Sequence, residues 1–411
     1  TAANVMLELE RKFDFHFFES GSGGDPLLWQ HLFWIFGHPD VYIIFLPAVG
    51  IVSSIIPVFS RRPIVAYTWV ALATVLIGIV GFGVWVHHMF ATGLPQVTMT
   101  FFSAASFMIV IPSGIQVFAW IATVLAGRPV LRTPFLYALG FVVVFVIGGL
   151  TGLMFAAVPF DQQTTDSYFV VAHFHYVLFG GAVFPIFAGI HYWLPKISGR
   201  MFSELAGQVS FWLVFSGFNL TFFPMHISGL LGMPRRVYTF PGGLGWDAYN
   251  LLSTIGAFVL ALGILVVVAN VVWTLARGAP ASPDPWGGNT LEWSTSSPPP
   301  HYNFPVVPVV RSADPNWDVE DRRRDALRLE RGELLLADGH QTLGTSVLEA
   351  ETDDVLHMPS ESIWPLVLAL TLALVFFALL LDHNGLAIVA GVLVAGAIAG
   401  WHRPQPELRD Q

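Results

Sequence analysis

The chain contains no cysteine among its 411 residues. This absence excludes disulfides, zinc–thiolate sites, iron–sulfur clusters and thiol catalysis, so any metal must be held by His, carboxylate, Met or Tyr side chains. Charge is scarce as well: Asp, Glu, Lys and Arg make up only 11% of the chain, against about 25% in ordinary soluble domains. With 54% hydrophobic residues and a mean hydropathy of +0.64, the composition is typical of an integral membrane protein.

Nine apolar runs come near the length of about 20 residues that an α-helix needs to cross a bilayer. Seven form a core group at 34–57, 66–92, 102–125, 134–158, 167–193, 209–231 and 251–275, and two follow at 362–381 and 386–401. We therefore predict an all-α fold, a polytopic transmembrane helix bundle of about seven core spans with two extra carboxyl-terminal spans.

The same pattern predicts five segments along the chain. They are an outer lead-in at 1–33, core helices at 34–275, a hydrophilic inner-side segment at 276–361, a two-span membrane hairpin at 362–401 and a polar tail at 402–411. Within the hydrophilic segment, the sequence SSPPP followed by the charged run EDRRRD predicts an extended stretch and then a short exposed helix. The hairpin has no ionisable residue inside either span, which favours a lipid-facing accessory role.

The distribution of Lys and Arg predicts the orientation of the spans. Basic residues fall in alternate loops: Arg61 and Arg62, Arg128 and Arg132, Lys196 and Arg200, and Arg277. The loops at 93–101 and 159–166 contain none, so we place these loops outside and the long hydrophilic segment inside. Arg235 and Arg236 lie in an outer loop against this rule, which indicates an anionic partner nearby.

Five histidines inside the predicted spans fall at a similar depth near the outer face: His38, His87, His88, His173 and His175. Ionisable residues within spans are costly and mark functional sites by default. A lone histidine in such a protein is more often a packing residue or a proton relay, and we keep that interpretation for His16, His191, His226 and His383. Five imidazoles in one layer favour metal ligation instead.

The spacing of the first three histidines restricts how they can meet. His38 and Tyr42 are four residues apart and therefore share one face of a helix. His87 and His88 are adjacent and diverge by about 100° on an α-helix, so both can reach one centre only near a bent or crowded helix end. Three neutral imidazoles in an apolar setting suit a copper ion.

The remaining pair points in two directions. His173 and His175 are two residues apart, or about 200° around a helix. One helix could therefore ligate a different metal centre on each flank. Single axial imidazoles are also a common ligation mode of haem iron.

Several motifs around these residues resemble subunit I of cytochrome c oxidases. They are WIFGHPDVY at 34–42, WVHHMF at 85–90 and VAHFHY at 171–176, with GGDP at 23–26, TFFP at 221–224, GMPRR at 232–236 and NTLEW at 289–293. The match runs in order from about residue 7 to 305. So many spaced motifs make a chance similarity implausible.

The resemblance implies a role for each histidine of the first group. His38, His87 and His88 would hold the copper ion. Tyr42 would be cross-linked to His38 and would supply an electron and a proton when the O–O bond breaks. This makes Tyr42 the predicted catalytic residue.

The resemblance also implies two haems, and we expect them to be a-type. His173 would be the axial ligand of the high-spin haem, which binds oxygen, and His175 one of two axial ligands of the low-spin haem. Arg235 and Arg236 would pair with haem propionates, since Arg suits bidentate carboxylate recognition. Asp166 stands where many members have a His-Asp pair that binds magnesium, so it is the remaining candidate ligand for that ion.

The implied activity is reduction of O2 to water with electrons from cytochrome c, coupled to proton translocation. The implied partners are membrane lipid, a copper-bearing subunit II, subunit III and cytochrome c, with no nucleic acid. The extra carboxyl-terminal spans favour a bacterial plasma membrane over the mitochondrial inner membrane.

Three departures from the family pattern bear on this interpretation. The family has about five further spans ahead of the first span found here, carrying the second ligand of the low-spin haem; we therefore expect the chain to be a fragment or to need a partner chain with those spans. Asp40 replaces the usual Glu, and Gln116, which follows Ser113 in the IPSGIQ motif, replaces the Lys of a proton channel. Because Gln cannot titrate, the proton path through Asp40, Ser113 and Gln116 is altered.

Four alternatives remain open from the sequence. A quinol oxidase would share the same core, and a nitric oxide reductase is disfavoured by Tyr42 one turn from His38. Asp40 and Gln116 are compatible with a non-pumping or non-catalytic relative. A polytopic transporter with a histidine-lined proton path would bind neither haem nor copper.

Overall fold

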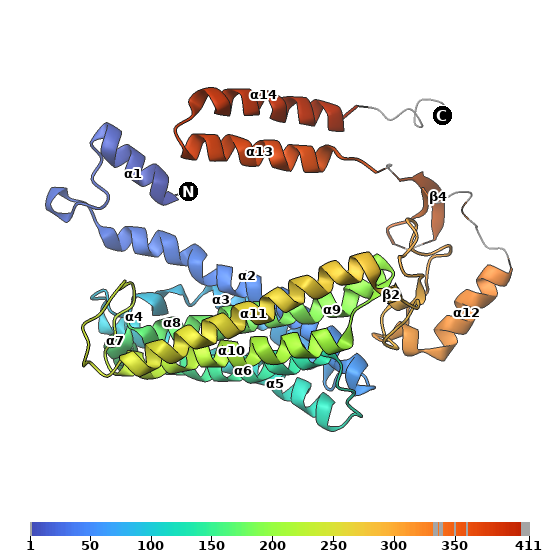
Figure 1. Cartoon of the computed structure of the whole chain (residues 1–411), viewed down its shortest axis with the longest axis horizontal. Helices are drawn as coiled ribbons and strands as arrows, with labels where there is room; N and C mark the ends of the chain where they lie inside the picture. Colours follow the sequence, from blue (N-terminus) through green and yellow to red (C-terminus); the bar gives the residue numbers. More distant parts are fainter. Residues whose placement is uncertain (1, 332–335, 337–339, 349–350, 359–360, 404–411) are drawn as a thin grey trace. The chain divides into compact units, whose positions relative to one another are not determined.

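The computed structural model describes residues 2–331, 336, 340–348, 351–358 and 361–403. The chain divides into two compact units. The first consists of Thr1–Pro299 and Arg311–Val319, and the second of Pro300–Val310 and Glu320–Gln411 (Figure 1). All the histidines predicted to bind metal belong to the first unit.

The first unit is a bundle of long helices joined by short irregular turns. Its elements in chain order are α1 (Ala2–Phe13), η1 (Ser20–Ser22), α2 (Pro26–Ser60), α3 (Tyr67–Phe82), η2 (Trp85–Met89), α4 (Gln96–Met108), α5 (Val110–Leu125), α6 (Thr133–Ala156), α7 (Val158–Thr164), α8 (Tyr168–Phe174), η3 (His175–Val183), α9 (Phe184–Ser198), β1 (Arg200–Met201), α10 (Glu204–Leu230), α11 (Asp247–Arg277), β2 (Ala279–Pro280), η4 (Leu291–Ser294) and η5 (Pro315–Trp317). Asp25 begins α2 by accepting a hydrogen bond from the Leu27 N–H, with Pro26 as the first helical residue.

Seven helical stretches among the described residues are long and apolar enough to cross a membrane. They are Pro26–Ser60, Gln96–Leu125, Thr133–Ala156, Tyr168–Ser198, Glu204–Leu230, Asp247–Arg277 and Asn384–Trp401, and two shorter apolar helices lie at Tyr67–Phe82 and Trp364–Leu380. These nine helices match the nine predicted apolar runs in order. The prediction of an all-α, multi-pass membrane fold is confirmed.

The predicted span at 66–92 is shorter in the structure. Helix α3 ends at Phe82, and the N–H of the next residue, Gly83, donates to the Val80 carbonyl. Glycine favours this end because its helix propensity is lower than that of every other residue except proline. His87 and His88 then lie on the 3-10 turn η2. The prediction of one continuous helix was wrong over its last third, and the break supplies the bent helix end that two adjacent histidine ligands require.

The span predicted at 167–193 has three parts. The α-helix α8 passes at His175 into the π-helical segment η3, and α9 continues the span to Ser198. A π-helix widens each turn by one residue and therefore rotates the later side chains about the axis; such segments are frequent at functional sites. The π-helical segment was not predicted.

Helices α10 and α11 pack closely because glycine lies at their contact. A Cβ atom on Gly217 of α10 would stand 2.4 Å from the backbone nitrogen of Leu260, and one on Gly256 of α11 would stand 2.4 Å from that of Thr221. Small residues allow membrane helices to approach in this way. Figure 1 shows the two helices running side by side along the bundle.

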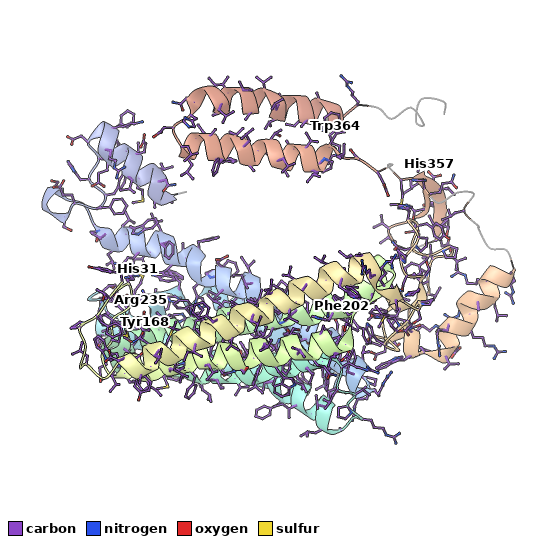
Figure 2. The ribbon with its side chains drawn as sticks, in the orientation of Figure 1. His31, Tyr168, Phe202, Arg235, His357 and Trp364 are labelled. Atoms are coloured by element: carbon purple, nitrogen blue, oxygen red, sulfur yellow. The ribbon has the colours of Figure 1, made fainter. Side chains whose placement is uncertain are left out.

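The two ends of the bundle carry different loops. Tyr168, at the start of α8, and Arg235, from a predicted outer loop, lie at one end of the first unit, whereas Phe202, next to the basic residues of a predicted inner loop, lies at the other (Figure 2). At that second end, the buried Lys196 ammonium donates hydrogen bonds to the carbonyls of Pro283 (2.6 Å) and Thr295 (2.7 Å). Lys196 thereby anchors the first part of the hydrophilic segment to the bundle.

The second unit contains the charged helix and the carboxyl-terminal hairpin. Its elements are α12 (Val319–Glu330), an antiparallel pair of strands β3 (Gln341–Thr345) and β4 (Thr352–His357), and helices α13 (Trp364–Leu380) and α14 (Asn384–Trp401). The charged run forms a helix as predicted. The strand pair was not predicted, and the five proposed segment boundaries stay predictions.

Candidate metal centre

Three imidazole rings from two segments of the chain meet near the end of α3. The Nδ1 atom of His38 on α2 lies 3.0 Å from Nε2 of His87 and 3.0 Å from Nε2 of His88, both on η2. These ligand atoms all lie within 4.8 Å of one another. Among the described residues, this is the one group of three or more His, Asp or Glu side chains arranged to hold a metal ion. We refer to it as the histidine trio.

The hydrogen bond behind His87 determines which of its nitrogens faces the trio. Ser106 on α4 donates its hydroxyl hydrogen to the Phe102 carbonyl (2.6 Å), and its oxygen lies 2.8 Å from Nδ1 of His87. Because the hydroxyl hydrogen is already used, Nδ1–H of His87 donates to Ser106. Nε2 of His87 is then left with a free lone pair, the arrangement that metal-binding histidines usually have.

Aromatic contacts hold the other two rings. His88 stacks on the indole of Trp34, with ring centroids 3.8 Å apart and planes 6° from parallel. The Tyr42 ring lies edge-on to His38 at 4.6 Å, one turn along α2 as predicted. Gly81 on α3 makes room for Tyr42, because a Cβ atom there would stand 2.6 Å from the tyrosine ring.

His173 on α8 is oriented by α6. Thr151 donates its hydroxyl hydrogen to the Gly148 carbonyl (2.9 Å), so Thr151 Oγ1 accepts from Nδ1–H of His173 (2.8 Å). This hydrogen bond leaves Nε2 of His173 available as an acceptor or ligand.

His175 contacts a different neighbouring helix. Its Nδ1–H donates to the Val171 carbonyl (2.8 Å), and its ring stacks on Phe222 of α10 at 3.9 Å with planes 14° apart. His173 therefore faces α6 while His175 faces α10. The prediction that these two histidines point to opposite flanks agrees with this placement.

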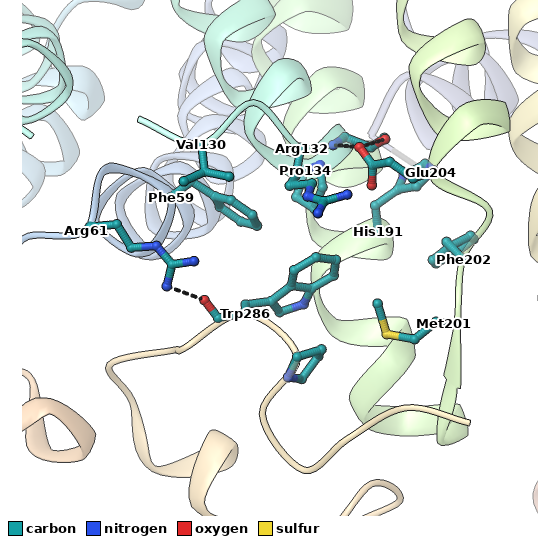
Figure 3. Close-up of a pocket in the computed structure, with 12 residues that line it drawn as sticks. Phe59, Arg61, Val130, Arg132, Pro134, His191, Met201, Phe202, Glu204 and Trp286 are labelled. Atoms are coloured by element: carbon teal, nitrogen blue, oxygen red, sulfur yellow. Dashed lines mark hydrogen bonds between the residues drawn. The ribbon is translucent and has the colours of Figure 1, made fainter. Parts of the chain in front are cut away.

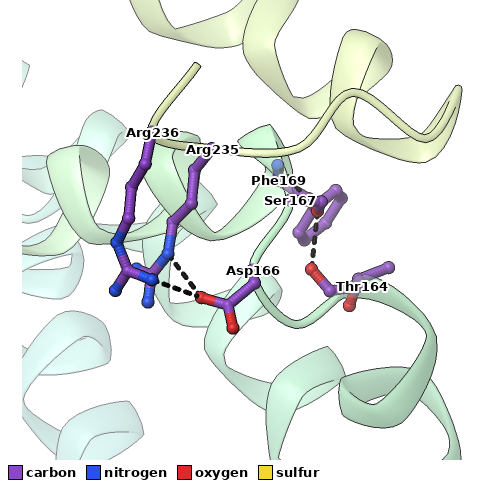
Figure 4. A network of polar contacts seen from close by, with 6 residues as sticks. All are labelled: Thr164, Asp166, Ser167, Phe169, Arg235 and Arg236. Atoms are coloured by element: carbon purple, nitrogen blue, oxygen red, sulfur yellow. Dashed lines mark hydrogen bonds and ion pairs between the residues drawn. The ribbon is translucent and has the colours of Figure 1, made fainter.

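The two arginines of the outer loop converge on one carboxylate (Figure 4). Nε of Arg235 lies 2.7 Å from Oδ1 of Asp166, and a terminal nitrogen of Arg236 lies 3.3 Å from the same oxygen. The backbone N–H of Arg235 also donates to the Asp166 carbonyl (2.9 Å). Two positive charges thus meet one negative charge, which leaves the network with a net positive charge.

This network is attached to the start of the helix that carries His173. Ser167 caps α8 by accepting from the Phe169 N–H, and its hydroxyl donates to the Thr164 carbonyl (2.6 Å) (Figure 4). Asp161, on the preceding helix α7, is 9% exposed. Burial raises the pKa of the Asp161 carboxyl to about 7, and the negative charge of nearby Asp166 adds to this rise.

The family profile described as "Cytochrome C and Quinol oxidase polypeptide I" matches residues 1–259, more than half of the chain. The chain belongs to this family. The resemblance to subunit I of cytochrome c oxidases is therefore confirmed.

Curated relatives named cytochrome c oxidase subunit 1 agree with this assignment. The Bacillus subtilis protein is 47% identical over 381 residues, covering 92% of this chain and 58% of the relative. The Alkalihalophilus pseudofirmus protein is 40% identical over 425 residues, covering 99% of this chain and 65% of the relative. The chain therefore spans about 58–65% of the length of these relatives.

A solved structure shares the fold. The work titled "Cryo-EM structure of a heme-copper terminal oxidase dimer provides insights into its catalytic mechanism" contains a chain with a TM-score of 0.57 and 24% identity, covering 62% of this chain and 50% of that one. At this identity the likeness concerns the fold alone.

Membership of the cytochrome c and quinol oxidase family implies haem and copper, and the residues present fit both. An imidazole nitrogen binds a transition metal at about 2 Å, so two ligands of one ion lie at most about 4 Å apart; the 3.0 Å separations of His38 from His87 and from His88 satisfy this limit. His173 and His175 each have Nδ1 occupied by a hydrogen bond. The arrangement of the donors therefore suits single axial imidazoles for two haem irons.

Within the described part of the chain, no hydrogen bond joins the predicted proton-path residues to one another. Asp40 is half-buried on α2 and Ser113 is half-buried on α5. Gln116 is fully buried, and its Nε2 donates to Thr74 on α3 (2.8 Å). Its Oε1 has no hydrogen-bond partner within the described part of the chain.

Sequence reasoning missed the residues that orient the candidate ligands. Ser106 and Thr151 determine that Nε2, rather than Nδ1, of His87 and His173 is available to bind a metal, and Gly81 makes room for Tyr42. None of these lies at a motif spacing from its partner, because each belongs to a different helix. Trp34 lay within the WIFGHPDVY motif, but its stacking on His88 follows only from the tertiary structure.

Proposed function

We propose that this chain carries the oxygen-reducing centre of a respiratory terminal oxidase. The reaction is reduction of O2 to water with electrons from cytochrome c, coupled to movement of protons across the membrane. The observation that carries the proposal is the histidine trio, in which Nδ1 of His38 lies 3.0 Å from a nitrogen of each of its two partners. Membership of the cytochrome c and quinol oxidase family supports it independently.

In this proposal the histidine trio holds the copper ion, His173 the iron of the high-spin haem and His175 that of the low-spin haem. When bound, these metals supply the electron-transfer chemistry. The chain fixes the ligand nitrogens through Ser106 and Thr151. Such second-layer hydrogen bonds orient the rings and raise the basicity of the ligand atoms.

Tyr42 is the proposed proton and electron donor. Its ring lies 4.6 Å from that of His38, and Nε2 of His38 is buried without a hydrogen-bond partner among the described residues. That nitrogen is the atom of His38 available for the cross-link to Tyr42 that the family resemblance implies.

The network of Asp166, Arg235 and Arg236 has a net positive charge, which suits the binding of anionic haem substituents. We propose that Arg235 and Arg236 pair with haem propionates, since one carboxylate does not neutralise both guanidinium groups. We also propose that the haems are a-type and that Asp166 offers its second oxygen, Oδ2, to magnesium.

The proposal also includes parts of the assembly on other polypeptide segments. We propose a copper-bearing subunit II, subunit III and the amino-terminal spans that carry the second ligand of the low-spin haem. The location proposed is a bacterial plasma membrane, in keeping with the bacterial relatives.

A second candidate is a relative that reduces oxygen without full proton pumping. It is favoured by Gln116, which cannot titrate and whose amide is engaged by Thr74 inside the bundle. Chemical protons would then enter past Asp40 or another group. A quinol oxidase with the same core differs only in its electron donor.

Replacing one histidine ligand tests the main proposal. In the purified complex, His87→Asn should abolish oxygen uptake and remove copper, while the absorbance of the low-spin haem persists. His31→Asn is the matched control, because His31 lies beside η2, where it accepts from Trp85, but outside the trio. A preparation with neither haem bands nor copper would overturn the oxidase assignment.

Proton pumping is tested separately in vesicles. The ratio of protons moved to electrons transferred should exceed that of an uncoupled control if the chain belongs to a pump. An equal ratio with normal oxygen uptake would favour the non-pumping relative, and Gln116→Lys would then be expected to restore an ionisable group at this position.

A further inference from the structure

A cavity of about 310 Å³ opens at the basic end of the bundle, remote in sequence from the histidine trio. Its walls come from the end of α2, the start of α6, α9, the start of α10 and the segment after α11. The volume lies at the lower end of the range for small-molecule sites, about 300–1,000 Å³. Figure 3 shows the side chains of Arg132, His191, Glu204 and Trp286 around one space.

The inner wall of this cavity carries an unpartnered imidazole. His191 is 1% exposed, and its Nδ1–H donates to the Phe187 carbonyl (2.8 Å). Its Nε2 therefore bears a lone pair, and this atom is buried without a hydrogen-bond partner in the described part of the chain. A buried acceptor of this kind is costly unless a donor reaches it, which points to a ligand hydroxyl or N–H group.

Glu204 adds a second acceptor. Its Oε1 receives hydrogen bonds from the N–H of Thr133 (2.8 Å), the hydroxyl of Thr133 (3.0 Å) and the amide of Gln208 (3.1 Å). These bonds hold the carboxylate in place, and Oε2 has no hydrogen-bond partner among the residues that the structure describes. The cavity thus offers two acceptors suited to hydroxyl groups.

The mouth of the cavity is positively charged. Arg61 and Arg132 are exposed, and Arg61 uses one terminal nitrogen to donate to the Trp286 carbonyl (2.9 Å) (Figure 3). Two guanidinium groups against the single carboxylate of Glu204 leave a net positive charge. Guanidinium groups recognise phosphate through paired hydrogen bonds.

We propose that this cavity binds a phosphate ester of a polyol, with the phosphate at Arg61 and Arg132 and the hydroxyl groups at His191 and Glu204. The same chemistry occurs in the head group of a phosphatidylglycerol lipid and in free glycerol phosphate. The basic loops place the cavity on the inner face by the positive-inside rule, where basic pockets of membrane proteins bind anionic head groups. The proposal is independent of the copper and haem assignments.

Ligand-dependent thermal stability of the purified complex tests this site, because a ligand that binds only the folded state raises Tm. The probes are sn-glycerol 1-phosphate, inorganic phosphate, dioctanoyl phosphatidylglycerol and dioctanoyl phosphatidylcholine at constant ionic strength. We expect a saturable rise in Tm with glycerol phosphate, phosphatidylglycerol or both, and none with phosphatidylcholine. A response to the lipid alone would identify the head group as the source.

Two variants and a matched control locate the response. Arg132→Gln should raise the half-saturating concentration about tenfold or more, the effect of losing a charge-assisted hydrogen bond. Arg128→Gln removes the same charge from the same loop outside the cavity and should leave the response unchanged. His191→Phe should raise the half-saturating concentration about two- to tenfold, the effect of losing a neutral hydrogen bond. Haem absorbance checks that each variant is folded.

Three outcomes would overturn the proposal. The first is the absence of a saturable response to glycerol phosphate and phosphatidylglycerol. The second is a response that persists unchanged in both Arg132→Gln and His191→Phe. The third is an equal response to inorganic phosphate, which would show that the hydroxyl groups are not recognised.

Discussion

The histidine trio and the cavity around His191 are built from the same local element, an imidazole whose Nδ1–H is already used. In the trio, His87 donates through Nδ1 to Ser106 (2.8 Å); in the cavity, His191 donates through Nδ1 to the Phe187 carbonyl (2.8 Å). Both rings therefore present Nε2 as an acceptor. The two regions differ in what surrounds that nitrogen.

Around His87 the neighbours are two further imidazoles, which places three nitrogen donors within one ion's reach. The cavity that His191 lines also carries two arginines, a carboxylate and aromatic rings, which suit an anion that bears hydroxyl groups. The chemistry of a buried histidine in this bundle therefore depends on side chains from neighbouring helices rather than on its own helix.

Loss of the hydrogen bond between His87 and Ser106 should have the largest effect, a decrease in copper affinity at the histidine trio. Ser106→Ala removes the group that fixes Nε2 of His87 as the ligand atom, and we expect copper affinity to fall about 10- to 100-fold. Metal analysis after dialysis against a chelator measures it. Ser103→Ala is the control, because Ser103 on the same helix donates to Ala156 instead (2.6 Å). Equal copper loss in both variants would contradict the role of Ser106.

Crowding Tyr42, the proposed catalytic residue, should have the second largest effect. Gly81→Ala places a Cβ atom against the Tyr42 ring, at 2.6 Å without adjustment; such overpacking costs about 1–3 kcal/mol. We expect a lower Tm and slower oxygen uptake. Gly78→Ala, one turn earlier on α3, would meet only Leu46 at 3.8 Å. Unchanged turnover in Gly81→Ala would show that Tyr42 does not need its observed position.

A variant in the cavity around His191 tests whether ligand binding there is independent of copper binding at the histidine trio. His191→Phe should weaken the response to glycerol phosphate about two- to tenfold, while copper content and low-spin haem absorbance stay at the wild-type level. A parallel loss of copper would show that the cavity and the histidine trio are coupled and are not independent sites.

Charge at the outer loop should matter least. Asp166→Asn breaks the contacts with Arg235 and Arg236. Arg235 is half-buried, but Asp166 and Arg236 are exposed, and exposed ion pairs contribute about 0–1 kcal/mol. We expect a small decrease in Tm that shrinks further at high salt, with copper content unchanged. A decrease as large as that of Gly81→Ala would mean that charge, not imidazole convergence, stabilises the outer end.

The sequence pattern alone predicts the membrane helices of this protein and the helix faces on which several candidate site residues lie. Apolar runs of bilayer length predict the membrane helices, because in hydrocarbon every backbone polar group must be satisfied within the segment. Helix periodicity likewise predicts that His38 and Tyr42, four residues apart, share one face of a helix. It also predicts that His173 and His175, two residues apart, point in different directions. Helix ends were less predictable, as α3 shows by ending at Phe82.

Contacts between helices could be decided only by the tertiary structure. Ser106 behind His87, Thr151 behind His173 and Gly81 beside Tyr42 each join residues from different helices, and nothing in the local sequence encodes which helix faces which. The same holds for the cavity, whose walls come from five separate segments. Periodicity is a property of one segment, whereas a ligand site depends on the packing of several.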